Sequence, residues 1–172
     1  MTNALLGTRE LLYSHGDLKD WDGTSFADLR YPRGTWRTLF MTTDQKVRLI
    51  RPDGSVLLSI ERPEGRKVKT VPVWDGQDQR VGTIKSQGGL RLTSEAFNVL
   101  DGAGDILGAI RGSHARQKYE VFEADDQKVA STVLQGDTWA IDLEPNLTDD
   151  WTRLIVGFTV AAMEADLNPP QI

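Results

Sequence analysis

The sequence predicts a mainly β protein whose sheet closes on itself around one buried helix near the C-terminus. Three observations lead to this fold class. A strand–turn–strand pattern recurs four times between Lys46 and Leu134, small residues recur in the second strand of each copy, and an apolar run, LIVGFTVAAM, follows at 154–163. A large sheet must have its edge strands covered or paired, and closure into a barrel removes the edges altogether.

Each copy of the repeat consists of a short apolar strand, a turn rich in Asp and Gly, and a second strand. The copies begin at Lys46, Thr70, Ala96 and Lys118, and their turns contain Asp53-Gly54, Asp75-Gly76, Asp101-Gly102 and Asp125-Asp126. Asp-Gly between apolar runs favours a two-residue type I′ turn, in which both central residues need a positive φ. The third copy also leaves room for a longer loop. Four hairpins supply eight strands.

The second strand of each copy carries an apolar residue followed by mostly small ones. After Leu57, Val81, Leu107 and Val129 come Leu58, Gly82, Gly108 and Ala130, and then Ser59, Thr83, Ala109 and Ser131. Small side chains in a strand indicate that another part of the protein approaches the sheet closely.

Further strands are predicted outside the repeats. Residues 139–143 alternate between apolar and polar and read as a strand, whereas in the first 45 residues we expect strands at 10–13 and 36–41 and a loop at 16–25. The total is ten to twelve strands in one domain. Pro52, Pro63 and Pro72 are expected at strand ends or turns, where a missing N–H is tolerated.

The apolar run belongs to a predicted helix at 149–167. Thr148 is a suitable N-cap, Asp149 and Asp150 favour the first turn, and Asn168-Pro169-Pro170 ends the helix. About ten apolar residues are too few for a membrane span, which needs roughly 20. A helix that is apolar on all faces is instead buried in protein. We expect Glu164 and Asp166 to lie in solvent, and we predict that the core positions of the helix are Leu154, Ile155, Phe158 and Ala162.

Composition limits the possible functions. The net charge of −5 argues against a general nucleic-acid binder, and the lack of cysteine excludes disulfides, thiolate metal sites and thiol nucleophiles. The N-terminal sequence has no secretory signal pattern. Ser113-His114 lacks a nucleophile-elbow pattern, and the chain has two histidines. We therefore expect a protein that is not an enzyme and is cytoplasmic, with a peripheral membrane location as a further option.

The hairpin series followed by one hydrophobic helix resembles the Tubby-like superfamily, and more closely its phospholipid scramblase and LURP-one-related branch. The resemblance runs from about Val47 to Ala165 and is carried by "RLIRPDGSVLLSIERP", "VGTI", "FNVLDGAGDILGAIRGS", "KYEVFEADDQKVAS" and "WTRLIVGFTVAAMEAD". It implies that residues 1–172 form one Tubby C-terminal-like domain, a closed and mostly antiparallel barrel of about 12 strands around the central helix at 149–167.

The resemblance also implies a function without catalysis, in which the protein associates with lipid or with a membrane surface. Tubby proteins bind phosphoinositides through a basic face, and the matching candidates here form two groups. One comprises Arg62, Arg66, Lys67 and Lys69; the other comprises Arg111, Arg116 and Lys118, beside His114. Clustered cations attract anionic head groups, whereas the alternative interpretation is a pair of solvated loops.

We expect no cofactor, and calcium is the alternative. In scramblases a calcium-binding segment precedes the helix, and the same place here holds Asp142, Glu144, Asp149 and Asp150 without preserving the family pattern. Calcium needs six to eight oxygen ligands, so helix capping and solubility also explain these acids. The tryptophans are expected to pack in the core or at the barrel rim. The alternative function is a soluble scaffold or protein-interaction domain, so the expected partners are anionic phospholipid or a protein, with no nucleic acid.

Overall fold

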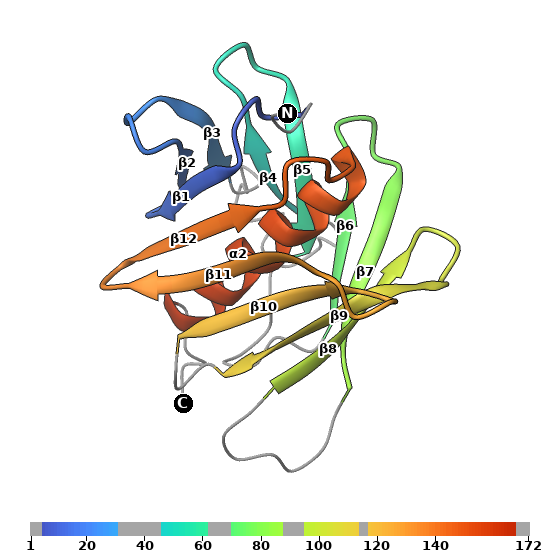
Figure 1. Cartoon of the computed structure of the whole chain (residues 1–172). Helices are drawn as coiled ribbons and strands as arrows, with labels where there is room; N and C mark the ends of the chain where they lie inside the picture. The colour runs from blue at the N-terminus through green and yellow to red at the C-terminus, as the bar shows by residue number, and fades with distance from the viewer. Residues whose placement is uncertain (1–4, 31–45, 62–69, 88–94, 114–116, 168–172) are drawn as a thin grey trace, which may run out of the picture.

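The computed structural model describes residues 5–30, 46–61, 70–87, 95–113 and 117–167, and in these residues it shows twelve strands and one helix (Figure 1). The strands form a closed barrel in which each strand pairs antiparallel with its neighbours. This confirms the predicted fold class. The strands are β1 (Glu10–Ser14), β2 (Asp17–Lys19), β3 (Ser25–Arg30), β4 (Lys46–Ile50), β5 (Val56–Glu61), β6 (Thr70–Trp74), β7 (Arg80–Ser86), β8 (Glu95–Asp101), β9 (Ile106–Ser113), β10 (Lys118–Glu123), β11 (Lys128–Gln135) and β12 (Thr138–Leu143).

Consecutive strands are also spatial neighbours, so the chain runs up and down around the barrel. The closure is the antiparallel pairing of β1 with β12, from Glu10 opposite Asp142 to Tyr13 opposite Trp139. Because strand direction alternates, connections alternate between the two ends of the barrel. One end carries the β2–β3, β4–β5, β6–β7, β8–β9 and β10–β11 turns, and we call it the hairpin end. The other end carries the remaining connections, and we call it the loop end.

The five turns at the hairpin end share one geometry, which differs from the predicted type I′ turn. In each, the N–H of the first residue donates to the carbonyl of the fifth, and the N–H of the fourth donates to the carbonyl of the first. The fourth residue has a positive φ between 59° and 92°, and each strand pair shifts register beside the turn. A type I turn followed by a bulge has this pattern. The positive-φ residues are Gly23, Gly54, Asp78, Gly104 and Asp126.

Gly76 and Gly102 are therefore required for a reason other than their φ. Each is the second residue of its turn, and neither has a positive φ. A Cβ on Gly76 would collide with the carbonyl oxygen of Val56, and a Cβ on Gly102 would lie 2.7 Å from the carbonyl oxygen of Arg80. These glycines allow adjacent hairpins to approach each other.

The first residue of three of these turns is an aspartate that organises the loop. The Oδ1 atoms of Asp20, Asp75 and Asp101 each accept hydrogen bonds from the N–H groups two and four residues later, at 2.8–3.0 Å. Side-chain oxygens of this kind replace backbone partners in tight turns. The turn at Asp20 is a copy of the repeat that the sequence analysis missed.

The segment predicted as a loop at 16–25 instead contains β2, and β3 begins at Ser25. A two-residue turn joins β1 to β2, and its central residues His15 and Gly16 have φ values of 50° and 81°. Positive φ at both positions defines a type I′ turn. The strand predicted at 10–13 is confirmed by β1, whereas the one predicted at 36–41 lies outside the described residues.

Pro72 lies inside β6 rather than at a strand end, so that prediction was wrong. It pairs with Thr83 of β7, while the described pairing of β6 with β5 covers Trp74 and Val73 and stops there. Proline cannot donate to a ladder, so it suits a strand position where pairing on one side has ended.

The helix α2 (Asp149–Leu167) begins as predicted. The hydroxyl oxygen of Thr148 accepts a hydrogen bond from the Trp151 N–H at 3.2 Å, which is an N-cap interaction. Every residue from Trp151 to Glu164 is buried except Arg153, which is half-buried. Glu164 is 5% exposed, so its predicted exposure to solvent was wrong. Within the described residues, no helix is long and apolar enough to cross a membrane.

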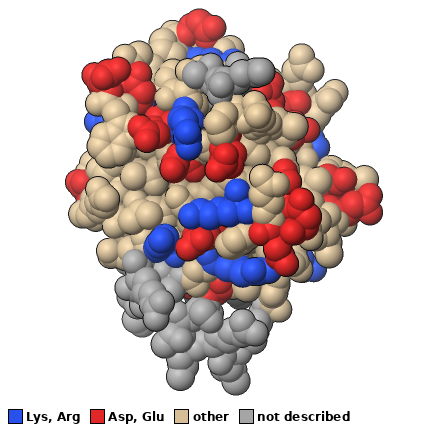
Figure 2. All heavy atoms as spheres, viewed as in Figure 1, with Lys and Arg blue, Asp and Glu red and all other residues tan. Residues whose placement is uncertain are grey.

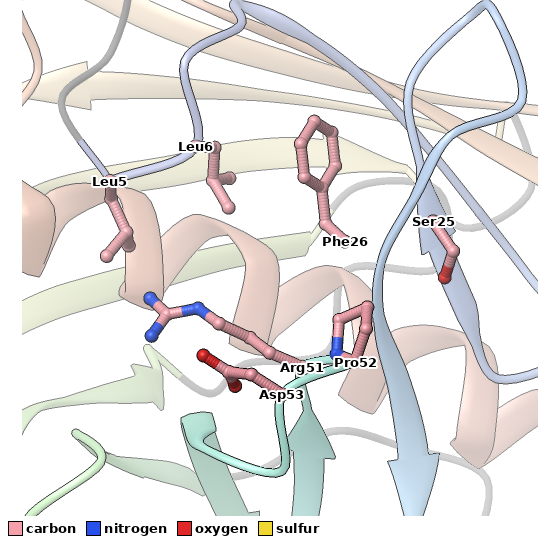
Figure 3. Close-up of a pocket in the computed structure, with 7 residues that line it drawn as sticks. All are labelled: Leu5, Leu6, Ser25, Phe26, Arg51, Pro52 and Asp53. Carbon is pink, nitrogen blue, oxygen red and sulfur yellow. The ribbon is translucent and has the colours of Figure 1, made fainter.

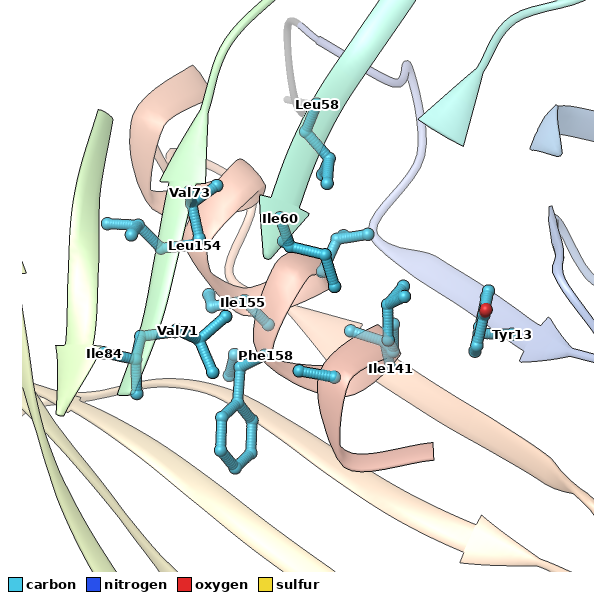
Figure 4. Close-up of a cluster of buried hydrophobic side chains, with 14 of the residues drawn as sticks. Tyr13, Leu58, Ile60, Val71, Val73, Ile84, Ile141, Leu154, Ile155 and Phe158 are labelled. Carbon is cyan, nitrogen blue, oxygen red and sulfur yellow. The ribbon is translucent and has the colours of Figure 1, made fainter. Parts of the chain in front are cut away.

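The helix lies inside the barrel, where Leu154, Ile155 and Phe158 pack among apolar side chains of the strands (Figure 4). Glycines let it lie close to the wall. A Cβ on Gly82 would lie 3.1 Å from Leu154 Cδ2, and a Cβ on Gly108 would lie 3.0 Å from Trp151. On the helix, a Cβ on Gly157 would lie 3.0 Å from Val73 and 3.2 Å from Ile60. At Gly82 and Gly108 the inference that small strand residues admit a close neighbour is confirmed, but the neighbours include adjacent strands as well as the helix: an added Cβ would also collide with the carbonyl oxygens of Leu100 and Phe122, respectively.

Aromatic side chains fill another part of the interior. The ring of Phe158 meets Phe97 and Tyr119 edge-on, at 5.0 and 5.1 Å between ring centroids. Trp139 packs against Tyr119 at 6.0 Å. Trp74, Trp139 and Trp151 are buried, as expected, but Trp21 is 60% exposed. Trp21 is the second residue of a hairpin-end turn, which accounts for its exposure.

Candidate functional site

The two ends of the barrel differ in charge. The five hairpin-end turns contain ten Asp and Glu residues and one cation, Arg51. The four longer connections that start and finish at the loop end, residues 31–45, 62–69, 88–94 and 114–116, contain eight of the chain's 20 Lys and Arg and two of its 25 Asp and Glu. The helix runs from the hairpin end to the loop end, because it follows β12.

The described members of the predicted basic groups lie on the outer wall, each beside an acid. Arg111 on β9 contacts Asp126 at 3.2 Å, and its guanidinium lies 5.0 Å from the centre of the Phe122 ring. Lys118 on β10 lies 3.7 Å from Glu120. Acids neutralise both cations locally, which lowers their attraction for an anionic lipid.

Sequence reasoning missed the acid at the centre of this group. Glu120 also lies 3.5 Å from Lys128 of β11, so one carboxylate contacts two lysines. The alternation of Lys118, Glu120 and Phe122 with buried Tyr119 and Val121 was the signal that could have placed these side chains on one face. In Figure 2, Lys and Arg are interleaved with Asp and Glu on this side of the molecule, so the wall carries mixed charge.

The remaining candidates lie outside the described residues. They are Arg62, Arg66, Lys67, Lys69 and Arg116. The strand ends that flank them, Glu61 and Thr70 for one group and Ser113 and Lys118 for the other, belong to the loop end of the barrel.

The four candidate calcium ligands follow one another at the hairpin end. Asp142 on β12 lies 3.6 Å from Arg9, and Asp150 in the first turn of α2 lies 3.9 Å from Arg153. Asp149 and Glu144 are exposed. Within the described ranges, no group of three or more His, Asp or Glu side chains is placed to hold a metal ion. The structure therefore does not bring three of these four acids together.

A histidine–carboxylate contact joins two turns at the loop end. His15 Nε2 lies 2.7 Å from Asp137 Oδ2, which connects the β1–β2 turn to the β11–β12 turn across the barrel closure. Both side chains are about two-thirds exposed. The hydrogen bond from His15, helped by one from Thr138, lowers the pKa of Asp137 from its ordinary value of 3.8. The contact ties the first strand to the last.

Comparison with known proteins supports the fold alone. The X-ray structure of an Arabidopsis thaliana protein, AT5G01750, superposes with a TM-score of 0.63 over 91% of this chain and 90% of that chain, at 15% sequence identity. No protein-family model matches the sequence, and no curated protein matches it either. A shared architecture at this identity leaves function to be argued from the surface.

Proposed function

We propose that this protein is a non-enzymatic module that associates with an anionic lipid or membrane surface, as the resemblance to the scramblase and LURP-one-related branch of the Tubby-like superfamily implies. The supporting observation is the concentration of cations in the connections of the loop end. A side of a protein that is rich in Lys and Arg and poor in acids is attracted to anionic lipid head groups.

The charge at the hairpin end supports a preferred orientation. Ten acids lie in the turns at the opposite end of the barrel, so an anionic surface would attract the loop end and repel the hairpin end. The filled interior supports a binding surface on the outside of the barrel, because Leu154, Ile155 and Phe158 of α2 are each 1% exposed.

Vesicle co-sedimentation tests the proposal. Vesicles of phosphatidylcholine alone and of phosphatidylcholine with phosphatidylserine are compared at low and high salt. We expect binding only with phosphatidylserine, and weaker binding at high salt, because screening reduces attraction between exposed charges. Absence of binding at low salt would refute the proposal.

A pair of matched triple variants tests where binding occurs. Arg66→Ala, Lys67→Ala and Lys69→Ala together should weaken binding by about 3 kcal/mol, roughly two orders of magnitude, at about 1 kcal/mol per cation near the surface. Arg9→Ala, Arg80→Ala and Lys128→Ala remove the same charge from exposed positions at the hairpin end and should have a much smaller effect. Equal losses would show that net charge alone matters, and the loop-end assignment would then fail.

A protein-interaction domain is the second candidate, and exposed apolar side chains favour it. Trp21 is 60% exposed and Ile106 is 62% exposed, and both belong to the hairpin end. Exposed tryptophan is enriched at binding hot spots. A protein that co-purifies in stoichiometric amount and is lost on Trp21→Ser, while vesicle binding persists, would establish this second role.

A further inference from the structure

A pocket of about 400 Å³ opens on the outside of the barrel at the hairpin end (Figure 3). It lies between the N-terminal segment, the start of β3 and the β4–β5 turn. Its lining residues are Leu5, Leu6, Ser25, Phe26, Arg51, Pro52 and Asp53. The volume is at the small end of the range for ligand-binding pockets. An occupant is therefore about the size of one large amino acid or slightly more.

One side of the pocket is apolar. Leu5 and Phe26 are half-buried and pack against the barrel core, and Leu6 is 8% exposed. Phe26 precedes the inward-facing Ala27, so alternation along β3 places its ring on the outer face of the sheet. This side provides an apolar surface for an aliphatic or aromatic group.

Arg51 supplies a cation on the opposite side. In Figure 3 its side chain extends across the pocket from the β4–β5 turn, and its guanidinium points toward Leu5. Its Nη1 lies 3.4 Å from the Ser55 hydroxyl, a long hydrogen bond. Across the described part of the chain, Arg51 has no carboxylate within ion-pair distance, whereas Arg9, Arg111 and Arg153 each have one. A guanidinium has five N–H donors, and its fork matches a carboxylate.

Asp53 restricts which anions fit beside Arg51. Its Oδ1 accepts hydrogen bonds from the Ser55 hydroxyl at 2.6 Å and the Ser55 N–H at 2.9 Å. The hydroxyl bond is the largest cause that lowers the pKa of Asp53, so the carboxyl stays ionised at neutral pH. A fixed negative charge beside the guanidinium repels a dianion more than a monoanion. The second carboxylate oxygen of Asp53 would suit a hydrogen-bond donor that lies next to the ligand's carboxylate.

We propose that this pocket binds a small amphipathic monocarboxylate, with its apolar group against Leu5 and Phe26 and its carboxylate on Arg51. An apolar amino acid with a blocked amino group has this chemistry, and so does the C-terminal residue of a peptide. The site is at the opposite end of the barrel from the cationic connections, and the proposal does not depend on lipid association.

The first experiment is an NMR titration of the ¹⁵N-labelled full chain with N-acetyl-L-phenylalanine at neutral pH. Saturable shifts are expected for the amides of Ser25, Phe26 and the non-proline residues of the 51–55 turn. N-acetyl-L-phenylalanine amide lacks the carboxylate, and acetate lacks the apolar group, so each should bind at least about tenfold more weakly. Phenyl phosphate, a dianion, should also bind more weakly. Equal shifts with the amide, or shifts that do not saturate, would overturn the proposal.

Two variants test the cation. Arg51→Gln should weaken binding about tenfold or more, because the ligand loses a charge-assisted pair. Arg80→Gln removes an exposed cation from the neighbouring hairpin and should leave the titration unchanged. Because Arg51 is only half-buried and Arg80 is exposed, both variants should fold, and an unchanged remainder of the spectrum would verify this. Binding that survives Arg51→Gln would assign the shifts to another site.

A short peptide that ends in phenylalanine distinguishes the source of the carboxylate. If the peptide binds and its C-terminally amidated form does not, peptide C-termini are ligands. If the free acid alone binds, the natural ligand is a small molecule. Both outcomes support the pocket chemistry, whereas binding of neither carboxylate would refute it.

Discussion

The backbone of α2 lies closest to β5, β6 and β7, whereas on the side of β8, β10 and β12 aromatic rings fill the space, although α2 also approaches β12. The near side depends on Gly157 and Gly82, which have no side chain to separate helix from strand. The far side depends on Phe97, Tyr119 and Trp139. The helix is therefore off-centre in the barrel, and different substitutions destabilise its two sides. We expect overpacking to destabilise the near side, and cavities or buried polar groups to destabilise the far side.

The largest expected effect is that of Phe158→Asp on the far side. Phe158 is 1% exposed, so the variant buries an ionised carboxylate among aromatic rings. Truncation of a buried Phe alone costs about 3–5 kcal/mol, and total stabilities are about 5–15 kcal/mol, so we expect the domain to unfold. Circular dichroism and soluble yield provide the measurement.

Ile106→Asp is the matched control, since Ile106 is 62% exposed and should change stability by about 1 kcal/mol or less. A folded Phe158→Asp protein that merely lost membrane affinity would mean that α2 acts as an anchor instead of a core.

The second effect tests the near side. Gly157→Val should lower the free energy of unfolding by about 1–3 kcal/mol, because its side chain would press against Val73 and Ile60. Combining it with Val73→Ala opens room and should recover part of the loss. Urea denaturation of the single and double variants measures the coupling. Strict additivity would show that the two side chains do not compete for space.

The third substitution, Thr132→Val, should change the free energy of unfolding by less and should raise it if it changes it at all. Thr132 on β11 is fully buried, and its hydroxyl has no hydrogen-bond partner among the described residues. Thr132→Val keeps the shape and removes the unpaired group, so we expect a change between zero and a gain of about 1 kcal/mol. Thr159→Val is the comparison, because the Thr159 hydroxyl already donates to the Ile155 carbonyl at 2.9 Å. Thermal melts that showed a larger loss for Thr132→Val than for Thr159→Val would contradict this interpretation.

The smallest effect concerns the closure between β1 and β12. The folded pKa of Asp137 is below its ordinary value of 3.8, so its contribution to stability is present above that pH and is lost as the pH falls through the folded value. Asp137→Asn should therefore flatten the dependence of melting temperature on pH in this acid range. Because both side chains are exposed, the difference should be slight. An identical pH dependence in both proteins would show that the contact does not contribute.

Sequence alone predicted the parts of the fold that depend on local chemistry. The apolar run of α2, its Thr148 cap and the hairpin repeats each have a local signal, and all are present. The predicted turn type was wrong because Asp-Gly was assigned to a two-residue type I′ turn, whereas the turns are type I turns followed by a bulge. Gly76 and Gly102 are needed because a neighbouring hairpin is close, which only the three-dimensional packing reveals.

The candidate sites were harder to predict, since charge in a sequence does not show what lies across the sheet. Arg111 looked like a free cation, but Asp126 lies beside it from the neighbouring hairpin turn. Lys118 also lies beside an acid, Glu120, but this acid is two residues away on the same strand and could have been found from the alternation. The pocket beside Arg51 combines the N-terminal segment with a turn some 45 residues later, and no local pattern connects them. The alternation of residues along each strand did indicate which side chains face outward.

The position of α2 after all twelve described strands has a consequence for biosynthesis. Translation proceeds from the N-terminus, so the apolar inner faces of the strands leave the ribosome before the helix that covers them. Hairpins formed by neighbouring strands can assemble early, because their contacts are local. The β1–β12 pairing and the core contacts of Phe158 can form only after β12 and α2 have been synthesised. A chain released before residue 158 would expose these inner faces, and it is the species that chaperones would need to protect.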